Sequence, residues 1–174
     1  AYDWHTEIDG RLAIERLDRP AVKPRGAKTI DSERIAAWVE NWARFSINWA
    51  RNYVARDLAN RVVVTDLSSK GGFSRQQYVE GLFDLAENEA LIYETEVPAC
   101  RYWNIQLTDM KWVTLDYLNR QTSFNGHTAQ LDVDGKFRAV ISASDPGVPN
   151  WLDSAGHGRG VIFGRWLECD QPPL

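Results

Sequence analysis

The residues best suited to chemistry gather near the end of the chain, in residues 145–158, a polar stretch rich in glycine and proline. His157 lies there between two glycines, and Asp153 is four positions before it. Imidazole titrates near neutral pH, so a histidine that a carboxylate orients can act as a general acid or base. We therefore take His157 and Asp153 as candidate catalytic residues. The alternative is a surface or structural loop histidine.

Other side chains in and around this stretch are suited to holding a polar organic ligand. Asn150 and Trp151 provide an amide and a ring, and Arg120 provides a guanidinium that can bind a carboxylate through two hydrogen bonds. The alternatives are a tryptophan that closes the end of a β fold and an arginine in an ordinary salt bridge. The remaining candidate ligand-binding residues are Asn104, Tyr102 and His127.

The sequence lacks the usual motifs for metal binding, for a serine nucleophile and for phosphate binding. The three histidines and two cysteines have no metal-motif spacing, so we predict no metal site. No serine stands in a Gly-x-Ser-x-Gly turn, and Gly71-Gly72 lacks the spacing of a phosphate-binding loop, so we predict no cofactor. We expect Cys100 and Cys169 to be two buried thiols, with a disulfide as the alternative.

A turn at Gly135 sets the register of the strands that must position these residues. Apolar and polar residues alternate on both sides of it. A two-residue turn would place Leu131 opposite Arg138, whereas a three-residue loop places Leu131 opposite Phe137, so that the two faces agree. The sequence therefore predicts a type I turn with a bulge, and a left-handed backbone at Gly135.

A long helix is predicted over residues 31–61, because Asp31 or Ser32 can cap its start and aromatic residues recur at spacings of three and four. We expect this aromatic stripe to be buried against a sheet or another domain. The alternative is an exposed platform for a ligand or partner. The stripe consists of Ile35, Trp38, Trp42, Phe45, Trp49 and Tyr53.

The remainder of the chain predicts short strands joined by turns. Residues 101–107 alternate clearly between two faces, and residues 160–168 are apolar on both faces, as expected for a central strand. The predicted fold is mainly β with one long helix: an antiparallel β-sandwich or jelly-roll-like barrel with the helix packed outside. The expected organisation is a linker or extended segment over residues 1–30, the helix over 31–61 and the sandwich over 62–174.

Composition limits the partners. The chain has 174 residues and a formal net charge of −4, with lysine and arginine scattered along it, which argues against nucleic acid. No apolar run approaches the roughly 20 residues that span a bilayer. We expect a soluble, cytoplasmic protein, and leave export open because the chain begins with Ala1 and its N-terminus could be processed. The expected partners are an upstream domain or second subunit on the aromatic helix face, and a small molecule.

Three stretches resemble the family called domain of unknown function 1214. They are residues 89–95, 100–107 and 145–157, within a resemblance that covers residues 75–168. The resemblance implies a β-rich domain, which in this family often stands at the C-terminal end of a longer chain beside a second domain. It implies no settled activity, so no catalytic residues are carried over from it.

Two functions remain as hypotheses. The first is a small-molecule-binding or interaction module, with the helix docked to another domain or subunit. The second is an enzyme with hydrolase- or lyase-like acid–base chemistry, in which His157 and Asp153 act on a small polar or aromatic substrate. A pocket that joins His157 to Trp151, Arg120 and Asn104 would favour the enzyme, whereas an isolated and exposed His157 would favour the module.

Overall fold

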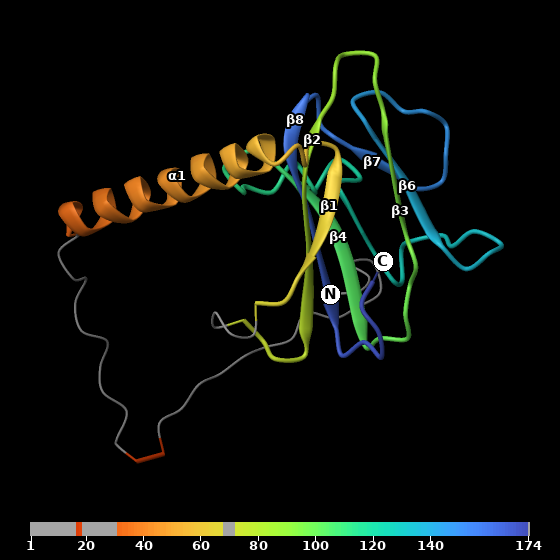
Figure 1. The fold of residues 1–174 in the computed structure, drawn as a ribbon, viewed down its shortest axis with the longest axis horizontal. Helices are drawn as coiled ribbons and strands as arrows, with labels where there is room; N and C mark the ends of the chain where they lie inside the picture. Colours follow the sequence, from red (N-terminus) through yellow and green to blue (C-terminus); the bar gives the residue numbers. More distant parts are fainter. Residues whose placement is uncertain (1–16, 19–30, 68–71, 174) are drawn as a thin grey trace.

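The computed structural model describes residues 17–18, 31–67 and 72–173, which form a β-sandwich of two sheets with one helix outside it (Figure 1). The predicted fold class is confirmed as a sandwich, without a closed barrel. The predicted N-terminal linker lies outside the described residues, apart from residues 17–18. The elements are α1 (Ser32–Ala55), β1 (Arg61–Thr65), β2 (Gln76–Asp84), β3 (Leu91–Thr95), β4 (Tyr102–Thr108), β5 (Ser123–Asn125), β6 (Phe137–Ser142), β7 (Trp151–Asp153) and β8 (Arg159–Leu167).

The larger sheet has the order β1-β2-β8-β4-β5, and the smaller sheet has the order β3-β6-β7. Strand β8 is central, as its two apolar faces predicted, with β2 and β4 antiparallel on its two sides. Strand β7 runs parallel to β6, so the sandwich is not wholly antiparallel. This short strand lies inside residues 145–158, the polar stretch rich in glycine and proline.

The hydrophobic core lies between the two sheets and is built from alternate residues of each strand. On β4, Trp103 and Ile105 point into it, while Asn104 between them lies on the outer face. The ring of Phe137 on β6 packs 5.1 Å from the ring of Trp103, which joins the two sheets. Full burial of each such side chain contributes about 2–3 kcal/mol, so this aromatic contact is a principal source of stability.

The turn before β6 has the predicted geometry. Leu131 lies opposite Phe137, and the backbone N–H of Asp132 donates to the carbonyl of Lys136 at 2.9 Å. Gly135 has φ 81°, the left-handed conformation that the three-residue loop requires. The residues before the turn form only an isolated bridge, however, because β6 takes its ladders from β3 and β7.

Helix α1 begins where predicted and ends earlier than predicted. The Asp31 carboxylate accepts a hydrogen bond from the Arg34 N–H at 3.0 Å, which caps the first turn. The helix ends at Ala55, since Asp57 and Asn60 take left-handed φ angles of 53° and 58°. The chain then turns into β1. No helix in the described part of the chain is long and apolar enough to cross a membrane.

The C-terminal half of α1 packs on the sandwich, and Trp42 Nε1 near the middle of the helix donates to the Lys111 carbonyl at 2.9 Å. Figure 1 shows the N-terminal end of the helix extending away from both sheets. Trp49 Nε1 donates to the Glu80 carboxylate at 3.3 Å, and the Tyr53 hydroxyl donates to the Glu80 carbonyl at 3.2 Å. The ring of Trp112 lies 5.1 Å from that of Trp49 and 5.3 Å from that of Phe163 on β8. These contacts hold the end of the helix against the outer face of the larger sheet.

The prediction that the aromatic stripe is buried is wrong for most of its length. Trp38, Trp42 and Phe45 are 66%, 41% and 46% exposed, and only Tyr53 at the far end is fully buried. Helical spacing correctly predicted which residues share a face. It carried no information on whether another element covers that face.

Candidate functional site

Asp153, at the end of β7, uses both carboxylate oxygens for contacts within the fold. One oxygen accepts from Arg120 Nη1 at 2.8 Å, and the other accepts from the Ala155 N–H at 2.7 Å. The Asp153 side chain is 5% exposed, whereas that of Arg120 is 47% exposed. The structure therefore joins two of the predicted site residues, Asp153 and Arg120, and the carboxylate orients the guanidinium and the following turn instead of His157.

His157 lies on the surface beside a cavity of about 290 Å³. Its Nδ1 is 3.1 Å from the Ser154 carbonyl, and left-handed φ angles at Ala155 and Gly156 bend the chain between them. Ser154 also lines the cavity and is 1% exposed, and its hydroxyl has no hydrogen-bond partner among the described residues. A buried hydroxyl without a partner is unfavourable. This cavity is therefore a better candidate site for a small polar ligand than the Asp153–Arg120 pair, whose carboxylate is already satisfied.

The side chains of Asn150 and Trp151 form hydrogen bonds with the backbone of the smaller sheet. Asn150 is 6% exposed, and its amide accepts from the Gln130 N–H at 3.0 Å and donates to the carbonyls of Gln130 and Arg138 at 2.6 and 2.8 Å. Trp151 Nε1 donates to the Ser142 carbonyl at 3.2 Å. These hydrogen bonds hold the start of β7 against β6 and the segment around Gln130. A ligand-binding role for Asn150 or Trp151 stays a prediction.

The remaining candidates lie elsewhere in the fold. Asn104 and Tyr102 stand on the outer face of β4, where Asn104 is paired with Arg165 of β8. His127 is exposed in the turn after β5, and its backbone N–H donates to the Asn125 side chain at 2.8 Å. None of these three candidates lines the cavity beside His157. Among the described residues, no group of three or more His, Cys, Asp and Glu side chains could hold a metal.

Helix α1 has a second apolar face beside the aromatic stripe, which we did not predict and which we call the apolar flank. Its members recur at spacings of 4, 4, 3 and 4, and that pattern in the sequence would have revealed it. Two apolar grooves of about 430 and 460 Å³ run along it, where Met110 faces the helix. The apolar flank consists of Val39, Ala43, Ile47, Ala50 and Val54.

A row of charged residues borders the apolar flank. Glu33 and Glu40 lie in the N-terminal half of α1, and Arg44 and Arg51 lie in the C-terminal half. Their spacings of 7, 4 and 7 put them on one side of the helix. Arg44 and Glu40 form an ion pair of 2.6 Å within the helix. The row therefore changes sign from acidic to basic along the helix.

A solved structure resembles this chain, but its name gives no activity. No family model matches the chain, and no curated protein matches it significantly. The crystal structure of an uncharacterized protein from Burkholderia cenocepacia is 32% identical, with a TM-score of 0.81, over 98% of this chain and 49% of that one. This chain thus spans about half the length of that protein.

A crystal structure of a protein from Vibrio parahaemolyticus is 19% identical over 57% of this chain and 29% of that one. Its TM-score of 0.46 is too low for the likeness to carry an argument. Neither structure bears on the resemblance to domain of unknown function 1214, which stays a prediction.

Proposed function

We propose that this protein is an interaction module in which α1 packs against α1 of a second copy. The observation that carries the proposal is the exposure of large apolar side chains on a helix that extends from its own sandwich. On the apolar flank, Val39, Ile47 and Val54 are 53%, 50% and 62% exposed. Contiguous apolar surface of this kind is unfavourable in water, and it is typical of an interaction site.

An antiparallel pair of helices makes use of the grooves beside the apolar flank. The N-terminal end of α1 extends beyond the sandwich, whereas the helix from Ala43 onward forms the grooves with Met110 and Leu82. When two helices run in opposite directions, the N-terminal end of each helix enters the groove of the other copy. Val39 of each copy then covers Ile47 of its partner, and both apolar surfaces leave water.

The charged row also favours an antiparallel arrangement of the two α1 helices. In the antiparallel arrangement, Glu33 lies opposite Arg51 of the other copy, and Glu40 lies opposite Arg44. In a parallel two-fold pair the two charged rows would lie on opposite sides of the interface, so these acidic and basic residues would not meet. Because the two copies are related by a two-fold axis, each favourable contact is made twice.

The experiment is sedimentation velocity over a range of protein concentrations. The protein is expected to change from monomer to dimer as the concentration rises. Ile47→Glu places a charge in the groove and is expected to keep the protein monomeric. The matched control is Ile92→Glu, which makes the same change at an isoleucine that is 68% exposed on β3, and it should dimerise as the unchanged protein does.

Two results would contradict the proposal. One is a monomer at every concentration tested. The other is equal dimerisation of the Ile47→Glu and Ile92→Glu variants, since that would place any interface away from the apolar flank. Far-ultraviolet circular dichroism of both variants checks that each keeps its secondary structure.

Small-molecule binding is a second candidate function, favoured by the unpartnered Ser154 hydroxyl in the cavity beside His157. Glu87 and Glu89 also line this cavity, which suits a small molecule with a hydroxyl or amino group. A fragment screen by NMR tests it, with binding expected to shift the amide signals of residues 154–158. Binders that shift only signals elsewhere would rule this site out. Since Asp153 is bonded to Arg120, we do not propose acid–base catalysis by Asp153 and His157.

A further inference from the structure

The two cysteines face each other across the end of the larger sheet. Cys100 stands just before β4, and Cys169 follows β8. The β4–β8 ladder pairs Tyr102 with Leu167, and the same register continued by two residues pairs the cysteines. They are 69 positions apart in the sequence, so only the fold brings them together.

Backbone hydrogen bonds continue past the named strands on both sides of the cysteine pair. The Asp170 N–H donates to the Ala99 carbonyl at 3.0 Å, and the Arg101 N–H donates to the Leu167 carbonyl, also at 3.0 Å. Glu168, between them, has a left-handed φ of 54°. The cysteines therefore occupy a position between two cross-strand hydrogen bonds, with their side chains on the same side.

This position suits a disulfide. Residues that face each other between the hydrogen bonds of an antiparallel ladder have Cα atoms about 4.5 Å apart, and disulfides join Cα atoms about 4.4–6.8 Å apart. The two thiols lie close enough to interact with each other. We propose that Cys100 and Cys169 form a reversible disulfide, by exchange with a small disulfide-containing molecule, which fastens the end of β8 to the start of β4.

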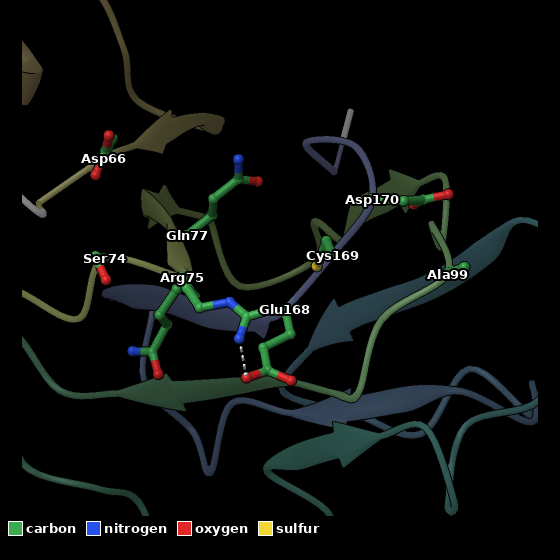
Figure 2. A pocket seen from close by; sticks show the side chains of 9 residues that line it. Asp66, Ser74, Arg75, Gln77, Ala99, Glu168, Cys169 and Asp170 are labelled. Carbon is green, nitrogen blue, oxygen red and sulfur yellow. Dashed lines mark ion pairs between the residues drawn. The ribbon is translucent and has the colours of Figure 1, made fainter.

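The cavity in Figure 2 gives such a molecule access. It has a volume of about 440 Å³, and Cys169 lines it beside Glu168 and Arg75, which form an ion pair of 3.1 Å. Both cysteines are partly exposed. A disulfide reagent can therefore reach Cys169 without unfolding of the sandwich.

The reaction is a pair of thiol–disulfide exchanges. One cysteine thiolate attacks a sulfur of the reagent, which forms a mixed disulfide, and the first reagent thiol leaves with a proton. The second cysteine thiolate then attacks the protein sulfur of the mixed disulfide, and the Sγ–Sγ bond forms as the second reagent thiol leaves with a proton. Two protein thiols are oxidised, and one reagent disulfide is reduced to two thiols.

The surroundings make the exchange slow at neutral pH. Burial raises the pKa of both thiols, that of Cys169 to about 12 with its neighbour Cys100 as a further cause. Because the thiolate is the attacking species, few molecules react at pH 7, and the rate rises with pH. The folded protein is thus expected to react slowly at pH 7 and faster at pH 9.

The test uses the full chain with oxidised glutathione at pH 7 and pH 9. The expected product has lost two hydrogens and carries no glutathione, with Cys100 linked to Cys169 in the peptide map. Its melting temperature is expected to rise by about 10 °C, because the bond closes a long loop. The matched variants Cys100→Ser and Cys169→Ser should each stop as a single glutathione adduct.

Three results would overturn the proposal. They are two glutathione adducts on the unchanged protein, free thiols that persist at pH 9 while unfolded protein reacts, and a disulfide between two chains. Peptide mapping of the unchanged protein decides among these even where a serine variant fails to fold. The outcome is independent of the dimer test, since the cysteines lie outside the apolar flank.

Discussion

Replacing Asn150 with alanine should destabilise the fold strongly, although the residue lies in a stretch that looks like a loop. Its amide makes three hydrogen bonds, to the N–H and C=O of Gln130 and to the C=O of Arg138. The side chain is 6% exposed, so alanine leaves those backbone groups without a partner in a mostly dry site. Each unsatisfied buried group costs about 1–3 kcal/mol, and water can reach the Gln130 side, so we expect a loss of about 2–4 kcal/mol in the free energy of unfolding.

Urea denaturation followed by tryptophan fluorescence measures this free energy. A loss of this size lowers the midpoint at an unchanged slope and lowers the melting temperature by about 5–15 °C. The control is Gln130→Ala, which keeps all three hydrogen bonds because Asn150 contacts only the backbone of Gln130. The reasoning is refuted if Asn150→Ala changes the stability by less than about 0.5 kcal/mol, or if the control is equally damaging.

Two further substitutions test the turn before β6 and the candidate ligand site. Gly135→Ala should lower the free energy of unfolding by about 1 kcal/mol, because Gly135 has φ 81°; an unchanged urea midpoint would show that the turn does not need this conformation. His157→Ala should leave the melting temperature within about 2 °C of the unchanged protein, since surface side chains contribute little to stability and the imidazole's hydrogen-bond contact is with the Ser154 carbonyl, in the same turn. A large drop in calorimetry would mean that His157 is structural, and it would then no longer be a candidate for ligand binding.

The parts of the fold that follow from local rules could be predicted from the sequence. The side-chain period of a strand is two, so the parity of apolar residues around Gly135 decided the register of the turn. Strand β8 could be placed in the centre because its apolar residues occupy both faces. Strand β7 could not be predicted, since its three residues are held by distant partners such as the Gln121 carbonyl, which accepts from the Asp153 N–H at 2.9 Å.

The candidate site was harder to predict, because its contacts depend on residues far apart in the sequence. Asp153 is four positions from His157, yet Arg120, 33 positions away, takes its carboxylate in the fold. A guanidinium is always charged and is the stronger partner for a carboxylate. The exposure of α1 could not be predicted from the sequence either. The part of the helix that is covered depends on where Trp112 lies, because Trp49 packs on its ring. No local sequence pattern indicates the left-handed φ of 65° that places Trp112 there.

The most direct test of the proposed dimer is a mixing experiment with two charge-reversal variants. Glu33→Arg and Arg51→Glu each place like charges opposite one another twice in an antiparallel homodimer. At about 0.2–1 kcal/mol for each exposed pair, each variant alone should dimerise about 2- to 30-fold more weakly. In an equal mixture, Arg at position 33 of one chain meets Glu at position 51 of the other, and the unchanged Arg51 meets Glu33.

Native mass spectrometry with sedimentation velocity of the equal mixture gives the decisive result. The antiparallel arrangement predicts that heterodimers form in preference to both homodimers and that the mixture recovers the dimer fraction of the unchanged protein. A statistical mixture of dimers, or a mixture no more associated than the two variants alone, would contradict the pairing of α1 with a second copy.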